Sequence, residues 1–318
     1  MNKTDPHGNR SDAILKEYPE IKKLYGPFPP TAYIGILVVL TQYAIAYTCA
    51  LSSEFILVSI LSGITIGPYF SMFLLAFMHE ASHGLILHTR NGNRFLGCFA
   101  NLPLLLPIFE IFRQHHLAHH VHRGDETEDV DCPLSFEVRW VGRSSVLKTA
   151  WIFFNPIILP IRSIWKRPVK WNVFVICNWI CCFGAGAFVY ATAPGPGALL
   201  YLFISAWMSQ SLHPANARLI SEHMRPSSSY SFPCYDVNTH SYYGPMNAFN
   251  LNIGFHKEHH DFPRVPFLRL PQLREIAGSE KWYPSDSAHQ NRGISTLISF
   301  IFDKNLGLEE FSEHKTTK

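Results

Sequence analysis

Three clusters of regularly spaced histidines are the residues in this sequence best suited to chemistry. Their eight members stand mostly three or four positions apart: His79, His83, His116, His119, His120, His256, His259 and His260. Residues with this spacing lie on one face of a helix, with Cβ atoms about 5–6 Å apart. Histidine is the commonest metal ligand, so the spacing predicts three metal-binding helix faces. A histidine-rich surface helix is the alternative for any one cluster, but two copies of HxxHH are hard to ascribe to surface composition.

A ninth histidine, His223, follows the last long apolar stretch of the sequence. A lone histidine is more often structural than a ligand, but this position at the expected mouth of a helix bundle favours a ligand. Structural zinc takes four protein ligands and catalytic zinc three, so nine ligands imply two metals. Imidazole suits iron, zinc, copper and nickel alike, and the ligands alone therefore do not name the element.

Five further histidines are interpreted as flanking or structural. Four of them are off the predicted faces or in loops, and one precedes a proline at the edge of an apolar stretch: His88, His115, His122, His240 and His213. Neutral imidazoles would leave roughly four positive charges on two divalent ions, which nearby carboxylates could offset. A group of acidic residues follows the second cluster and is either such a partner or a solvated loop: Asp125, Glu126, Glu128, Asp129 and Asp131.

The first cluster also matches the HExxH pattern of zinc proteases, with Glu80 as the general base. A membrane protease of that type commonly has a further aspartate in an Asp-Gly pair, and this sequence contains no Asp-Gly. It would also leave the other histidines unexplained. The interpretation stays open as a distant alternative.

Charge is confined to parts of the chain, and the gaps predict membrane spans. Of the 318 residues 47% are hydrophobic and 16% charged, and residues 31–89 and 171–217 contain no Lys or Arg. About twenty apolar residues at 1.5 Å each cross a roughly 30 Å hydrocarbon core. We expect spans at about 33–52 and 55–78, and again at 171–192 and 198–213. The short connections within each pair predict two antiparallel hairpins.

The topology follows from the positive-inside rule. The two outer loops, at 53–54 and 193–197, contain none of the 27 Lys and Arg residues. Both termini and the long middle segment are therefore expected in the cytosol, where the histidines would gather. The predicted fold is an all-α membrane protein with four transmembrane helices, interfacial helices and a cytosolic histidine-rich di-metal cap.

Shorter apolar segments predict elements that do not cross the membrane. Residues 102–109 contain two prolines and fit a re-entrant or interfacial element, and 151–165 fits a helix lying in the interface. A helical pattern at 11–24 predicts an entry helix. We expect a cytosolic or interfacial segment at 1–30, followed by one membrane domain at 31–318.

Composition excludes other classes of function. The net charge is +3 without a long basic run, so nothing indicates a nucleic-acid-binding module. Seven cysteines without paired spacing are interpreted as free thiols. Three of them, Cys177, Cys181 and Cys182, are interpreted as small buried hydrophobes rather than a soft-metal site. The N-terminus lacks a cleavable signal, and Asn2 replaces the glycine that myristoylation requires.

The histidine pattern over four spans resembles that of the membrane fatty-acid desaturase and hydroxylase superfamily. The likeness is closer to its sphingolipid Δ4-desaturase (dihydroceramide desaturase) branch. It covers nearly the whole chain and rests on ILKEYPEIK at 14–22, FANLP at 99–103, DVD at 129–131, LHP at 212–214, SYYGP at 241–245 and HKEHHDFP at 256–263. The chain departs from the family pattern at Asn2, at Arg218 in place of a histidine, and by an insertion at 226–237. These departures bear on regulation and substrate choice.

The resemblance implies a di-iron centre held by the nine histidines, with no further catalytic residue. Its reaction would be the O2-dependent removal of hydrogen from C4 and C5 of dihydroceramide, giving ceramide with a trans double bond. No dinucleotide fingerprint or haem domain is visible. Electrons are therefore expected from NADH through cytochrome b5 reductase and cytochrome b5. The family also implies the endoplasmic reticulum membrane.

Three alternatives remain open at this point. A sphingolipid C4-hydroxylase, or a bifunctional desaturase and hydroxylase, requires no different ligand set. A zinc hydrolase would use the HExxH pattern with a single zinc. A non-catalytic lipid-binding membrane protein would not need the histidines for activity.

Overall fold

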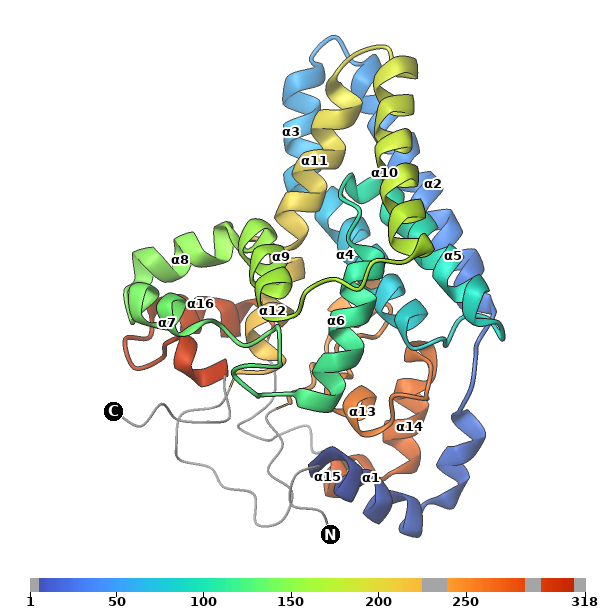
Figure 1. Ribbon diagram of the computed structural model, residues 1–318, viewed down its shortest axis with the longest axis vertical. Coiled ribbons are helices and arrows are strands. Elements are labelled where there is room, and N and C mark those ends of the chain that lie inside the picture. The colour runs from blue at the N-terminus through green and yellow to red at the C-terminus, as the bar shows by residue number, and fades with distance from the viewer. Residues whose placement is uncertain (1–5, 225–238, 284–292, 312–318) are drawn as a thin grey trace.

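The computed structural model describes residues 6–224, 239–283 and 293–311, and every regular element in these ranges is helical. The expected insertion at 226–237 and Cys234 lie outside them. An elongated bundle forms one half of the molecule (Figure 1). It contains α2 (Pro30–Leu51), α3 (Phe55–Thr65), α10 (Val173–Thr192) and α11 (Gly197–Ser209).

The other half divides into a central group and a side group (Figure 1). The central group contains α4 (Gly67–Ser82), α5 (Arg90–Asn101), α6 (Phe109–His122), α13 (His256–Asp261), α14 (Leu270–Ile276), α15 (Ser279–Trp282) and α1 (Pro6–Glu17). The side group contains α7 (Ser135–Val141), α8 (Ser145–Phe153), α9 (Asn155–Lys166), α12 (Ala217–Ser221) and α16 (Ile294–Phe302). Short 3-10 helices complete the chain: η1 (Pro19–Leu24), η2 (Leu102–Leu104), η3 (Pro214–Asn216), η4 (Pro245–Phe249), η5 (Phe267–Arg269) and η6 (Leu308–Phe311).

The bundle half has the surface of a membrane protein. Within the described residues, α2 and α10 are long and apolar enough to span a membrane, and the number rises to four if each of two bent helix pairs is one span. Large apolar side chains face outward, with Leu37 63% exposed and Ile180 66% exposed. Exposure of so much apolar surface to water is unfavourable, so these side chains fit an apolar surrounding such as the core of a membrane.

The second expected span is divided into two helices. α3 and α4 meet at Ile66 with a bend of 50°. A Cβ atom at Gly63 would lie 2.8 Å from Ile204, and one at Gly67 would overlap the hydroxyl of Ser205. The glycines therefore allow α11 to pack closely against both helices at the bend.

The fourth expected span, at 198–213, is wrong in length. α11 has 13 residues and ends at Ser209, which covers only about 20 Å at 1.5 Å per residue. Gln210 leaves the helix, and His213 then caps η3 by accepting from the N–H of Ala215 at 3.1 Å. Pro214 follows as the first residue of η3 and fits the start of a new helical turn, where no N–H is needed.

The segment at 102–109 forms the turn of a sharply bent helix pair. α5 with η2 meets α6 at 117°, a geometry that fits a re-entrant element. Asn101 closes the turn, because its Nδ2 donates to the carbonyl of Leu106 at 2.8 Å and its Oδ1 accepts from the N–H of Phe109 at 2.9 Å. The pair is also held by a bidentate contact of Arg94 with Glu110, at 2.7 and 2.6 Å.

The expected helix at 11–24 is also wrong in its bounds. α1 ends at Glu17, and η1 begins at Pro19. The residue before a proline is disfavoured in helical geometry, which explains the break at Tyr18. Ile14 and Ile21 still share one hydrophobic core with Phe262 and Leu270, so the N-terminal segment packs on the C-terminal part of the chain.

The interfacial helix expected at 151–165 is two helices, α8 and α9. They meet at Phe154, where Pro156 begins α9 within its first turn. Ile161 and Trp165 remain 60% and 78% exposed, as an interfacial position requires. Lys148 of α8 is buried. Its ammonium group donates to the carbonyl of Phe300 in α16 and to the carbonyls of Asp303 and Leu306, which follow that helix.

Candidate metal centre

The structure brings the nine predicted histidines together from five places in the chain. His79 lies on the last turn of α4, and His83 caps that helix. The second cluster lies on α6 and the third on the short helix α13, while His223 follows α12. All nine are buried or half-buried.

Five of these histidines form one group, whose ligand atoms all lie within 4.8 Å of one another: His79, His83, His116, His120 and His259. Adjacent Nε2 atoms are 2.9 Å apart between His83 and His116, and 3.0 Å apart between His116 and His120. The Nε2 of His259 lies 2.9 Å from that of His79 and 3.3 Å from that of His120.

These distances fit a shared metal ion better than hydrogen bonds. An imidazole nitrogen forms one hydrogen bond, whereas the Nε2 of His116 and that of His259 each have two nitrogen neighbours at such distances. Metal–imidazole bonds are about 2.0–2.1 Å long, so two ligands at right angles on one ion are roughly 3 Å apart. The five nitrogens therefore converge as ligands do.

The other four histidines form a second group. Ligand atoms of His119, His223 and His260 lie within 4.8 Å of one another. His256 completes it, with its Nε2 2.9 Å from that of His223 and 3.2 Å from that of His260. Each HxxHH cluster thus contributes to both groups, because one turn of helix aims its members at different points.

His119 shows the clearest preparation for a metal. Its Nδ1 lies 2.8 Å from Oδ1 of Asp129, while its buried Nε2 has no hydrogen-bond partner. A carboxylate on one ring nitrogen fixes the tautomer and leaves the other nitrogen for a metal. Burial alone would raise the pKa of Asp129, but His119 and the N–H groups of Gly124 and Asp131 hold that pKa below its ordinary value.

The acidic loop is therefore only partly a solvated loop. Asp129 is 2% exposed, and Oδ2 of Asp131 lies 3.3 Å from the same nitrogen of His119. Asp125 instead caps its own turn by accepting from the N–H groups of Thr127 and Glu128. Lys166 of α9 secures the loop by donating to the carbonyls of Asp129 and Cys132, at 2.8 and 2.7 Å.

The SYYGP segment explains how so short a helix as α13 is held in place. Ser241 and Tyr243 both donate to the buried carboxylate of Glu258, which lies between His256 and His259 in sequence. The hydroxyl of Ser241 also accepts from the N–H of Lys257 at 2.9 Å. Six residues of helix are marginal in isolation, and these contacts supply the missing stability.

Glu80 of the HExxH pattern makes a structural contact through one of its two carboxylate oxygens. It is buried, and its Oε2 accepts from the N–H of Phe267 at 3.2 Å. Its neighbour His83 belongs to the five-histidine group. Glu80 is therefore placed to join α4 to η5.

The five histidines interpreted from the sequence as flanking or structural lie outside both groups. His115 lies with its Nε2 2.9 Å from the carbonyl of Arg167, and His213 caps η3. No candidate metal group among the described residues contains a cysteine. Cys182 is buried as expected, but Cys177 and Cys181 are exposed on α10, which corrects the expectation for those two.

One residue at the site, Glu222, was not predicted from the sequence, and its partner Arg218 was noted only as a departure from the family pattern. The Oε2 of Glu222 lies 3.6 Å from Nε2 of His256, and the carboxylate forms a candidate metal group with His223 and His256. Burial raises the pKa of Glu222 to about 7, although Arg218 acts to lower it. The signal was available, because Glu222 adjoins His223 and stands at i+4 from Arg218.

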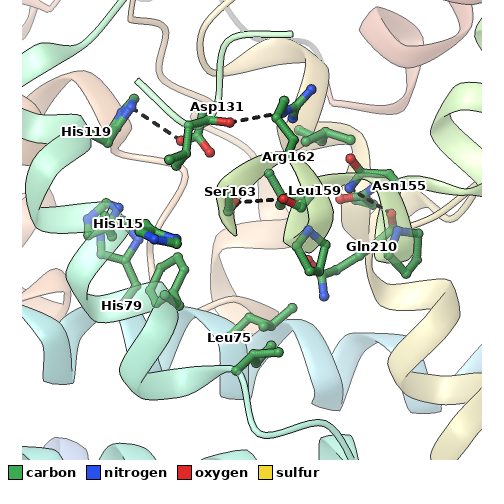
Figure 2. A pocket seen from close by; sticks show the side chains of 18 of the residues that line it. Leu75, His79, His115, His119, Asp131, Asn155, Leu159, Arg162, Ser163 and Gln210 are labelled. Atoms are coloured by element: carbon green, nitrogen blue, oxygen red, sulfur yellow. Dashed lines mark hydrogen bonds and ion pairs between the residues drawn. The ribbon is translucent and has the colours of Figure 1, made fainter. Parts of the chain in front are cut away.

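An apolar cavity of about 480 Å³ leads to the histidines. Figure 2 shows His79, His115 and His119 on one side of it and Asn155 and Gln210 on the other. Its lining is mostly apolar and comes from α4, α6, α9 and α11, including Leu75, Phe112, Leu159, Phe203 and Trp207. A hydrocarbon chain of a lipid fits such a lining, because it can be buried there without loss of hydrogen bonds.

The cavity also contains polar atoms without partners. Oδ1 of Asn155 and Nε1 of Trp207 are buried and have no hydrogen-bond partner. Both residues line the cavity, and Nδ2 of Asn155 donates to the carbonyl of Gln210. Two residues of the cavity wall thus contain a buried polar atom without a partner, one an acceptor and the other a donor.

Comparison with known proteins shows to which family the chain belongs. The fatty acid desaturase family model matches residues 55–290, and a sphingolipid Delta4-desaturase model matches residues 1–30. The sphingolipid delta(4)-desaturase DES1 of Xenopus tropicalis is 34% identical over 95% of this chain and 90% of its own length. The human protein of the same name is 31% identical over 95% of this chain and 90% of its length.

A yeast relative extends the likeness further along the chain. The sphingolipid delta(4)-desaturase of Komagataella phaffii is 33% identical over 99% of this chain and 87% of its own length. A family model over most of the chain and relatives of one type over nearly all of it agree. The chain belongs to the fatty acid desaturase family, in its sphingolipid delta(4)-desaturase group.

Proposed function

We propose that this protein is a sphingolipid Δ4-desaturase, which converts dihydroceramide to ceramide. The observation that carries the proposal is the convergence of nine histidines into two groups beside an apolar cavity. The relatives are named sphingolipid delta(4)-desaturases, which supports the same reaction. Two hydrogens leave the substrate at C4 and C5, and two external electrons with two protons complete the reduction of O2 to water.

The nine histidines would hold a pair of iron ions. One ion would bind His79, His83, His116, His120 and His259, and the other His119, His223, His256 and His260. When bound, the iron pair supplies the O2 activation that breaks an unactivated C–H bond, which no side-chain acid or base can do. The protein residues supply the position of the substrate and the exclusion of water.

The substrate position follows from the cavity. Phe112 and Leu75 line it near His79 and His116, so a saturated chain between them would present its methylene groups to the histidines. Asp129 holds His119 in one ring orientation, which keeps the donor atoms in place while the substrate enters. Asn155 and Trp207 also line this cavity, each with one buried polar atom that has no hydrogen-bond partner.

The membrane arrangement is part of the proposal. Residues 53–54 and 193–197 would lie on one side, with both termini and the histidine-rich cap on the cytosolic side. The start of α11 packs against the end of α2, since a Cβ atom at Gly197 would lie 3.1 Å from the carbonyl oxygen of Cys49. We assign the segment at 1–30 to the cytosolic side and residues 31–318 to one membrane domain, in the endoplasmic reticulum.

The electron source is expected to be external. NADH, cytochrome b5 reductase and cytochrome b5 are the proposed donors, because a one-electron carrier suits a metal centre that accepts electrons singly. This donor chain and the iron are carried over from the family resemblance. They are testable by reconstitution with and without cytochrome b5.

A C4-hydroxylase remains the second candidate function, because it would use the same ligands and the same first hydrogen abstraction. Two observations disfavour the zinc hydrolase as the function of this protein. Glu80 is bonded to the backbone of Phe267, and the family to which the chain belongs is one of desaturases. A purely lipid-binding role gives no reason for nine histidines to converge into two groups.

The test is to supply dihydroceramide to cells that lack their own Δ4-desaturase and express this chain. Wild type is compared with His256→Ala and with His122→Ala, a matched change at a histidine outside both groups. Mass spectrometry should detect ceramide with wild type and His122→Ala and none with His256→Ala. A hydroxylated product without ceramide would replace the Δ4 assignment by the hydroxylase.

A further inference from the structure

We propose that Glu222 is a tenth metal ligand, which completes the four-histidine group to five donors. The proposal rests on the di-metal function above and names a ligand outside the nine histidines. Glu222 lies directly before His223 and is 4% exposed. Its carboxylate, His223 and His256 form a candidate metal group by themselves.

The two groups are otherwise unequal. One has five imidazole donors, and the other has four. Glu222 lies beside the group that lacks a donor, so with Glu222 each group would offer five donors. Carboxylate oxygen and imidazole nitrogen are the usual donors of non-haem iron.

The distance between Glu222 and His256 indicates a shared ion. Oε2 lies 3.6 Å from Nε2, whereas a hydrogen bond between such atoms measures about 2.7–3.2 Å. With metal–ligand bonds of about 2.0–2.2 Å, two ligands on one ion are separated by roughly 3 Å at right angles and roughly 4 Å when opposite. The separation is too long for the hydrogen bond and falls within the range for two ligands.

Arg218 holds the carboxylate without using all of its acceptor sites. Nε donates to Oε1 and Nη2 to Oε2, each at 2.7 Å. A carboxylate has about four lone-pair positions, so Oε2 keeps one for a metal. Arg218 is therefore a positioning residue, one turn before Glu222 on α12 and within the cavity wall.

The proposal gives the two ions different surroundings. Five neutral imidazoles would surround one, and four imidazoles with one carboxylate the other. The oxygen donor changes the electric field gradient at the iron nucleus. The two irons should therefore give two separate quadrupole doublets of equal area in Mössbauer spectra.

The experiment uses the full-length protein, expressed with 57Fe and purified in detergent. Iron per chain is measured after gel filtration in the presence of a mild chelator, and Mössbauer spectra are recorded on the same samples. Glu222→Ala and Glu222→Gln are compared with wild type. Glu137→Gln is the matched control, since Glu137 is also buried and paired with an arginine, Arg162, at 2.7 Å.

We expect both Glu222 variants to lose one doublet and about half of the iron, as a roughly 10–100-fold loss of affinity at one site requires. Glu137→Gln should keep both. Arg218→Met should also keep the iron, because the carboxylate remains, while the parameters of one doublet shift. Circular dichroism checks that each variant is folded, and Glu222→Gln preserves volume if the alanine variant is not.

Two results would overturn the proposal. One is that the Glu222 variants retain all the iron with both doublets unchanged. The other is that Arg218→Met and the Glu222 variants lose iron equally, which indicates a structural ion pair alone. Wild type without iron would instead contradict the proposed di-iron function itself, so the two failures are distinguishable.

Discussion

Arg10 donates from Nε to Oδ2 of Asp261 at 2.7 Å, although 251 residues separate them in sequence. Asp261 directly follows His260 on α13, and its other oxygen lies 2.6 Å from Nδ1 of His7. The ring of His7 lies 5.2 Å from that of His260. Helix α1 thus holds the third histidine cluster from the outside through a buried ion pair.

The first prediction concerns this contact. Arg10→Met leaves the carboxylate of Asp261 buried with less compensation, which costs about 3–5 kcal/mol when one partner of a buried pair is removed. Thermal unfolding in detergent should occur at a lower temperature, and iron content should fall because α13 is less well held. Lys16→Met, an exposed change on the same helix, serves as control. An unchanged melting temperature for Arg10→Met would show that α1 does not support the site.

The second prediction concerns the orientation of His119. Asp129→Ala removes the acceptor at Nδ1, so the ring loses its fixed tautomer. Metal affinity should fall roughly 10–100-fold, as for other partners of metal-bound histidines. Iron content after dialysis against a chelator measures this effect. Glu128→Ala in the same loop should behave as wild type, because its contact at 2.7 Å is with Arg167. Equal iron content in both variants would contradict the role of Asp129.

The third prediction tests the cavity as the substrate site. Leu159→Trp places a larger side chain into the cavity from α9. Conversion of dihydroceramide should fall at least about tenfold, corresponding to about 1.4 kcal/mol of lost transition-state binding, while the iron content stays that of wild type. Ile161→Trp on the same helix is the control, because that position is 60% exposed. Full activity of Leu159→Trp would place the substrate elsewhere.

The fourth prediction concerns stability away from the site. Lys148→Met removes the ammonium group that donates to the carbonyls of Asp303 and Leu306, at 2.7 and 3.1 Å. Leaving buried acceptors unsatisfied costs about 1–3 kcal/mol, so the melting temperature should fall. Arg143→Met, which loses only a surface contact with Glu309, should change stability by no more than about 1 kcal/mol. A stable Lys148→Met protein would show that these carbonyls find other donors.

The sequence allowed the site to be predicted as far as local spacing extends. Helical spacing identified eight of the nine histidines, because i, i+3 and i+4 positions share a face whatever the tertiary structure. His223 was added because it follows the last long apolar stretch. The spacing did not predict which group each histidine joins. Neighbouring positions such as His119 and His120 point in different directions around the helix axis and belong to different groups. Glu222 and Arg10 were missed for a related reason. Their importance comes from contacts made only after distant segments pack together.

The fold, too, could be predicted from the sequence only in part. Apolar length predicted α2 and α10 closely, because a membrane core sets a physical length. The early end of α11 and the break at Ile66 depend on how the helices pack, including the close approach of Ser205 to Gly67. Pro19 could have divided the helix predicted at 11–24, since its effect on the preceding residue is local.

Each HxxHH cluster contributes donors to both histidine groups, so the positions of the two groups depend on each other. α6 sends His116 and His120 to one group and His119 to the other, while α13 sends His259 to the first and His256 and His260 to the second. Neither helix can rotate or shift to suit one ion without displacing donors of its neighbour. The positions of the donor atoms in one group are therefore tied to those in the other through the same two helices.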